Sequence, residues 1–132
     1  AILGGIGAVS LLVAAIGIAN TMVMSIYERT REIGIIKVLG ADIADIRRLF
    51  LLEASLIGLG GGILGLLLSL GGSWILNKVA GGFMGGAGKI SIIDPQLALG
   101  AIIFATFIGL VSGYAPARRA MNLSALEAIR NE

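Results

Sequence analysis

The stretch YERTREIGIIKVLGADIADIRRLFLLE, residues 27–53, decides the fold of this chain. It carries five of the ten Lys/Arg residues and five of the eight Asp/Glu residues. Long apolar runs without a charge lie on both sides of it. We therefore interpret the chain as membrane-spanning segments joined by one charged elbow, which we define as residues 27–48.

Composition supports this interpretation. The 132 residues are 57% hydrophobic and only 14% charged, whereas soluble domains contain roughly 25% charged residues. Three runs lack any Asp, Glu, Lys or Arg, namely residues 1–27, 54–77 and 95–117. Each run exceeds the ~20 apolar residues that a helix needs to cross a bilayer. The predicted fold class is an all-α membrane protein with a short cytoplasmic helix between the first two of three transmembrane helices, which cover about residues 2–26, 49–76 and 96–115.

The distribution of cationic residues predicts the topology. The elbow contains five Lys/Arg residues and the tail, residues 116–132, contains three, but the loop at residues 77–95 contains only two. Cytoplasmic segments carry the excess of positive charge in membrane proteins. We therefore expect a multi-pass protein of the plasma membrane, with its N-terminus outside and its C-terminus in the cytoplasm. Basic residues placed beside membrane spans indicate a lipid bilayer as partner, and no nucleic acid.

The sequence offers little catalytic chemistry. It contains no Cys and no His, which excludes disulfides and thiol metal sites and removes the commonest general base. Residues 60–65 match the pattern G-x-G-x-x-G, but no strand–turn–helix unit surrounds them. The Gly88-Lys89 pair lacks the remainder of a phosphate-binding loop, because residue 83 is Phe and residue 90 is Ile. We expect no catalytic residue, no metal site and no bound cofactor, and therefore no enzyme.

The middle of the elbow predicts a short amphipathic helix. Residues 33–39, IGIIKVL, are too few to span a membrane and too apolar for a solvated loop. Gly40 is expected to cap the C-terminus of this helix, and Asp42 to be the N-cap of the next one. That next helix has an apolar stripe at helical spacing, formed by Ile43, Ile46, Leu49 and Phe50.

Two interpretations of the elbow helix remain open from the residues alone. It could lie in the membrane interface on its apolar face, or dock into a groove on a soluble protein. The mixture of both charge signs favours a protein partner, because a lipid-binding elbow would be more purely basic.

Small residues at four-residue spacing predict close helix packing in the membrane. The predicted helix-packing residues are Gly61, Gly65 and Ser69 in the second span and Ala105, Gly109 and Gly113 in the third. Gly58 and Gly62 form a second line of small residues in the second span. The packing partner is another helix of this chain or of a second copy.

Two polar residues lie in or near the predicted spans. Asn20 is expected to make an interhelical hydrogen bond or to lie at the interface, and a substrate contact is the less expected role. Glu53 is expected to pair with a basic group, because an unpaired carboxylate at this depth is costly. The candidate partners are Arg29, Arg31, Arg118 and Arg119. The alternative for Glu53 is an interfacial carboxylate that reaches water.

Four stretches carry a resemblance to a known family. They are residues 17–22 (GIANTM), residues 28–34 and 39–41 (ERTREIG and LGA), residues 50–54 (FLLEA), and residues 116–120 with Leu123 and residues 127–130. Over these residues the chain resembles the C-terminal membrane region of FtsX-like permeases, the MacB/LolC-type membrane subunits of ABC transporters. Ser124 departs from the pattern, because such tails usually carry Pro there.

The resemblance implies partners and a function. In this family a first membrane helix and an outer domain precede the region, so we expect the chain to be part of a longer protein. The permeases resemble dimers, so a second permease copy is expected, bound to cytoplasmic ABC ATPase subunits that hold ATP and Mg. The elbow corresponds to the coupling helix, whose implied ATPase-coupling residues are Glu28, Arg29, Arg31, Glu32, Ile33, Gly34, Ile36, Lys37, Leu39 and Gly40.

The implied function is the membrane part of an ATP-driven ABC transporter, which relays the motion of the ATPase to an outer domain and exports a peptide, antibiotic or lipoprotein. The alternative is a membrane scaffold that regulates cell-wall hydrolases, or a stand-alone small helical membrane protein without transport activity. The residues do not select a substrate.

Overall fold

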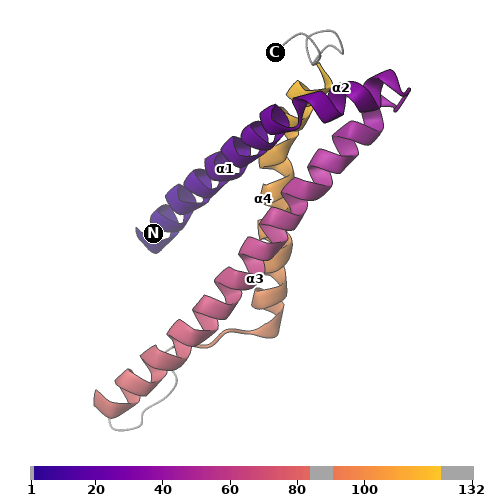
Figure 1. Ribbon diagram of the computed structural model, residues 1–132. Coiled ribbons are helices and arrows are strands. Elements are labelled where there is room, and N and C mark those ends of the chain that lie inside the picture. The colour runs from indigo at the N-terminus through magenta and orange to yellow at the C-terminus, as the bar shows by residue number, and fades with distance from the viewer. Residues whose placement is uncertain (1, 84–90, 123–132) are drawn as a thin grey trace.

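The computed structural model describes residues 2–83 and 91–122, and these residues are almost entirely helical (Figure 1). Within the described ranges there is no strand. Three of the helices are long and apolar enough to cross a membrane. The predicted all-α fold class with three spans is thereby confirmed. The helices are α1 (Ile2–Glu28), α2 (Thr30–Val38), α3 (Ile43–Phe83) and α4 (Pro95–Met121).

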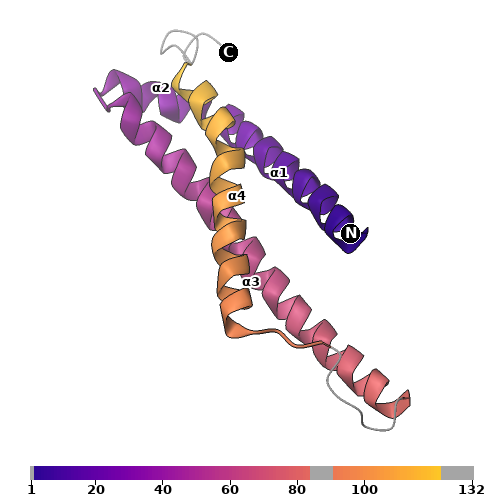
Figure 2. The ribbon, with the colours of Figure 1, turned by 180° about the vertical axis from the view of Figure 1, so that it is seen from behind.

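The elbow and the C-terminal turns of α4 lie at the same end of the molecule. In Figure 1 and Figure 2, α2 lies at the same end as the last turns of α4, and the N-terminus of α1 lies far from it. The α3–α4 pair makes the main contact of the fold, and α1 packs mainly against α4. The cationic residues of the elbow and the Arg118–Arg119 pair therefore gather at one end of the spans, as the charge distribution predicts.

A small buried cluster holds this end together. The buried side chains of this cluster lie at the elbow end, and much of the rest of each long helix is apolar surface suited to lipid. The N-terminal part of α1 is exposed throughout, for example Ile6 at 60% and Val13 at 64%. Each helix contributes to the cluster, which consists of Met22, Ile26, Ile33, Ile46, Phe50, Ala54 and Ala117.

Glycines allow α3 and α4 to touch along their backbones. A Cβ atom on Gly58 would lie 2.6 Å from the Ala105 carbonyl oxygen, and one on Gly109 would lie 2.6 Å from the Ala54 carbonyl oxygen. A Cβ on Gly113 would collide with the Ala54 side chain. These separations are shorter than van der Waals contact, so a larger residue would force the helices apart. The small residues predicted to pack in the third span, Ala105, Gly109 and Gly113, all lie at this contact.

The small residues predicted for the second span are a different case. Nothing lies within 4 Å of the Cβ positions of Gly61 and Gly65, and Ser69 is exposed. Within this chain these residues do not meet α4, because the face of α3 that does is the one carrying Gly58 and Gly62. Their predicted packing against a second copy stays a prediction. Two lines of small residues run along α3, and only the crossing of α4 selects between them.

The third helix is longer than the predicted span. It has 41 residues, or about 60 Å at ~1.5 Å per residue, against about 30 Å of bilayer hydrocarbon. It continues to Phe83 rather than ending at residue 76, so the predicted loop at residues 77–95 begins too early. Polar Asn77 and Lys78 end an apolar span without ending a helix. Lys78 lies over the Trp74 ring, with Nζ 5.0 Å from the ring centroid.

A hydrogen-bonded clasp fixes the return from α3 to α4. The Asn77 amide donates to the Ser91 carbonyl oxygen at 2.7 Å and accepts from the Ser91 backbone N–H at 2.9 Å. The Ser73 hydroxyl donates to the same carbonyl oxygen at 3.1 Å. These three hydrogen bonds to the backbone of one residue, Ser91, hold the segment before Pro95 against α3. Pro95 opens α4 in its first turn, as predicted.

Pro116 does not end the third span. It lies inside α4, which continues to Met121, so the predicted boundary at residue 115 is wrong. Proline loses one helical hydrogen bond, but membrane helices tolerate this where neighbouring groups compensate. Here Pro116 and Ala117 are buried, and that packing stabilises the continued helix. The rest of the predicted tail, residues 123–132, lies outside the described residues.

Candidate functional site

The elbow begins with a bend at Arg29, between α1 and α2 (Figure 1). Arg29 has φ −101° and ψ 13°, outside the helical norm, yet its N–H still donates to the Ser25 carbonyl at 3.1 Å. The Thr30 hydroxyl donates to the Ile26 and Tyr27 carbonyls, each at 2.9 Å. The side chain thus occupies carbonyls of the last turn of α1 where the helix changes direction.

Two capping motifs fix the other end of α2. Gly40 adopts φ +89°, its N–H donates to the Lys37 carbonyl, and the Ala41 N–H donates to the Ile36 carbonyl, both at 3.1 Å. This pair of bonds is a Schellman motif, and glycine suits its left-handed residue. Asp42 then caps α3, because its Oδ1 accepts from the Ala44 N–H at 3.3 Å. Both predicted caps are confirmed.

The two faces of α2 differ sharply. Ile33 and Gly34 face the bundle and are buried. Lys37 is half-buried on the same side, and desolvation by burial lowers the pKa of its amine. Ile33 is therefore unavailable to a groove on a partner, which corrects its expected place in the ATPase contact. Ile36 remains accessible, with 41% of its surface exposed.

The outward face of α2 is apolar, and we define it as Ile35, Ile36, Val38 and Leu39. Ile35 is 49% exposed, Val38 65% and Leu39 80%. Ile35 and Val38 are absent from the residues predicted for coupling. Helical spacing places them only once the buried face is known, since burial of residues 33, 34 and 37 on one face turns residues 35, 38 and 39 outward. Sequence alone does not say which face meets the bundle.

Charged residues flank the outward face. Glu28, Arg31 and Glu32 are all exposed, as is Gly40 at the end of the helix. The structure therefore brings most of the residues predicted for coupling to one accessible surface, with Ile33 and Gly34 beneath it. An apolar centre with charges of both signs around it is the anatomy of a protein–protein contact.

An ion pair ties the bend to α3. Arg29 Nη1 lies 3.6 Å from Glu53 Oε2, so the predicted pairing of Glu53 is confirmed and Arg29 is the partner. The Arg29 side chain is 49% exposed and that of Glu53 33%, so water screens the pair and its contribution to stability is small. Its place is informative, because it joins the residue where the chain bends to the start of the second span.

Asn20 finds no partner within the described part of the chain. Its residue is exposed on α1, and it makes no hydrogen bond to another described residue. The predicted interhelical hydrogen bond is thus not made inside this chain. Gly61 lines one apolar groove of about 350 Å³, while Gly65 and Ser69 line another of about 320 Å³.

Comparison with known proteins places the chain in a family. The model of the FtsX-like permease C-terminal domain matches residues 4–125. An ABC transporter permease of Methanocaldococcus jannaschii is 43% identical over 97% of this chain, which covers 32% of that protein. The macrolide export ATP-binding/permease protein MacB of Acinetobacter baylyi is 41% identical over 99% of this chain, which covers 19% of it.

A third relative has a different named cargo. The pyoverdine export ATP-binding/permease protein PvdT of Pseudomonas syringae is 41% identical over 98% of this chain, which again covers 19% of that protein. The chain thus spans a minor part of each of these relatives. The chain belongs to the FtsX-like permease family and corresponds to its C-terminal domain.

Proposed function

We propose that this chain is the membrane-spanning part of an ATP-driven ABC transporter, and that the outward face of α2 receives the motion of a cytoplasmic ABC ATPase. The observation that carries the proposal is the exposure of Ile35, Ile36 and Leu39 on a helix too short to span. An apolar helix face with charged neighbours fits helix-in-groove recognition. ATP and Mg belong to the ATPase, and this chain performs no catalysis of its own.

The buried cluster supplies a route for that motion. Ile33 lies under the outward face of α2 and belongs to the same cluster as Met22, Phe50 and Ala117 from the three long helices. Close-packed interiors move as units because their side chains have no free space. A displacement of α2 therefore acts on α1, α3 and α4 together, and carries to the opposite end of the spans.

Topology and a second copy follow from the same proposal. The elbow and the last turns of α4 face the cytoplasm, because the cationic residues gather there. The N-terminus of α1 then lies outside. The exposed Asn20 and the unoccupied small face at Gly61 and Gly65 support contact with a second permease copy, since polar and small residues associate helices in lipid. An exported peptide, antibiotic or lipoprotein is the substrate class.

The outward face is tested by Ile36→Glu. We expect capture of the co-expressed ABC ATPase to fall about tenfold or more, equivalent to roughly 1.4 kcal/mol, because a carboxylate would be desolvated in an apolar groove. The matched control is Ile36→Leu, which keeps the apolar contact and should keep the capture. The measurement is ATPase bound per permease, with ATP hydrolysis of the purified complex. Undiminished capture by the Glu variant would count against this face.

The Arg29–Glu53 ion pair is tested by Glu53→Gln. We expect this substitution to weaken the coupling between ATP hydrolysis and permease function. The free energy of unfolding should change by less than about 1 kcal/mol. Because one contact is responsible, Arg29→Gln should have the same effect, and the double variant should be no worse than either single one. Additive losses in the double variant would mean that the two residues act separately.

A further inference from the structure

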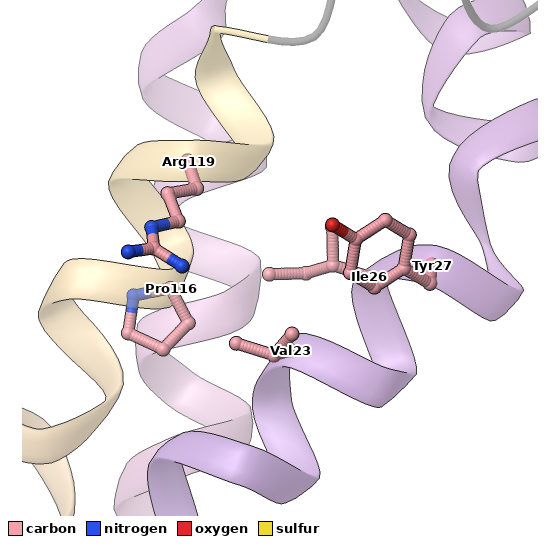
Figure 3. Close-up of a pocket in the computed structure, with 5 residues that line it drawn as sticks. All are labelled: Val23, Ile26, Tyr27, Pro116 and Arg119. Carbon is pink, nitrogen blue, oxygen red and sulfur yellow. The ribbon is translucent and has the colours of Figure 1, made fainter.

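A small cavity opens between α1 and α4 near the elbow end (Figure 3). Its volume is about 60 Å³, and Val23, Ile26 and Tyr27 line it from α1, with Pro116 and Arg119 from α4. One water needs roughly 15 Å³ on this scale. The cavity therefore holds a group the size of a phosphate or a few methylenes, and the remainder of a larger ligand would lie outside it.

The residues that line the cavity change from apolar to cationic toward the elbow end. Val23 to Tyr27 close the charge-free run 1–27, and Pro116 lies within the charge-free run 95–117. Arg119 is the second residue after that run, behind Arg118. The cavity thus has apolar walls on its membrane side and a cation at its mouth. From this charge pattern we expect bilayer hydrocarbon to give way to headgroups at this level.

Arg119 is suited to an anion there. It is exposed, and among the described residues no carboxylate lies within ion-pair distance of it. In Figure 3 its guanidinium lies beside the Pro116 ring, and the Tyr27 hydroxyl points toward α4. A guanidinium can bind a phosphate through two parallel N–H donors. A phenol hydroxyl can donate a further bond.

We propose that this cavity binds an anionic phospholipid of the leaflet at the elbow end. Its phosphate lies on Arg119 and Tyr27, and its glycerol backbone and first acyl carbons lie against Val23, Ile26 and Pro116. Basic pockets between transmembrane helices are known to hold acidic headgroups. An ATPase is a poorer occupant, because Val23 lies a full turn inside the span, where a soluble protein does not reach.

The lipid seated here would bridge α1 and α4 beside the bend at Arg29. These two helices contact each other less extensively than α3 and α4 do. An anionic lipid between them would therefore hold the first span against the bundle at the elbow end. This site is separate from the outward face of α2, so the proposal does not depend on ATPase coupling.

The test is lipid binding to the purified chain in detergent, measured by native mass spectrometry. Phosphatidylglycerol and phosphatidylcholine with identical acyl chains are the two probes. We expect tighter binding of phosphatidylglycerol, and about a fivefold loss of it in Arg119→Gln, which corresponds to about 1 kcal/mol for one cation at the surface. The matched control is Arg118→Gln, which removes the same charge from an exposed neighbour outside the cavity and should bind normally.

Further variants keep the test decisive. Val23→Phe fills the cavity without changing charge, and we expect it to weaken phosphatidylglycerol binding even if Arg119→Gln folds poorly. Equal losses in the Arg118 and Arg119 variants would overturn the proposal, because diffuse charge would then explain binding. Equal affinity for both lipids, or competition by glycerol phosphate as strong as by the lipid, would overturn it too. The proposal would also be overturned if the Arg119→Gln and Val23→Phe variants lost ATPase capture but bound lipid normally. The cavity would then be a contact with a protein.

Discussion

Replacing Phe50 with alanine is expected to lower the free energy of unfolding by about 3–5 kcal/mol, the range for large-to-small changes at buried aromatic residues. Phe50 is 1% exposed and is one of the two largest fully buried side chains, together with Met22. Its loss leaves a cavity where all four helices meet. The measurement is reversible unfolding in detergent.

The effect should extend beyond stability to the position of α2. Ile33 of α2 is held in the same cluster as Phe50. Removing the Phe50 side chain should therefore loosen α2 and increase hydrogen exchange of the elbow amides. The matched control is Phe107→Ala, because Phe107 is 56% exposed on α4 and should cost little. Similar losses from the two variants would show that burial at the elbow end does not stabilise the fold.

The second large effect is expected at Gly109, where α4 touches α3. Gly109→Ala places a Cβ 2.6 Å from the Ala54 carbonyl oxygen and 3.0 Å from the Gly58 Cα. Neither backbone atom can move without shifting the helix. We therefore expect a loss of about 1–3 kcal/mol, typical of overpacking, and a larger loss for Gly109→Leu.

The control for this experiment lies on the same helix. Gly100 has nothing within 4 Å of its Cβ position, so Gly100→Ala should be neutral or stabilising by up to about 1 kcal/mol, the helix-propensity gain of alanine over glycine. If alanine lowers the stability at residue 109 but not at residue 100, close packing is the cause. Thermal unfolding in detergent measures both, and equal stability of the two variants would contradict a tight α3–α4 contact.

Hydropathy and local capping chemistry determined the framework of this protein. Three charge-free runs had to become helices, because in lipid only a helix satisfies its own backbone polar groups. The left-handed Gly40 and the Asp42 cap divided the elbow into two helices from local residues alone. Residue types also predicted that Glu53 needs a cation, since a carboxylate at that depth is costly without one.

Hydropathy could not locate the helix ends. Asn77 and Lys78 close the apolar run of the second span, yet α3 continues to Phe83. Pro116 is a helix breaker in isolation, yet α4 continues through it. In both places, hydropathy reports the solvent around the chain and not the backbone hydrogen bonds that define a helix. The clasp on Ser91 and the burial of Pro116 depend on residues distant in sequence.

Only the tertiary structure decided which of several equivalent faces is used. Two lines of small residues run along α3, and the crossing of α4 selects Gly58 and Gly62 over Gly61 and Gly65. Ile33 and Ile36 are alike as residues, and the packing of α2 buries the first and exposes the second. Arg29 was one of several cations available to Glu53. The physical reason is that residue type fixes how much a side chain gains from burial or pairing, whereas helix crossing fixes which side chain comes within reach.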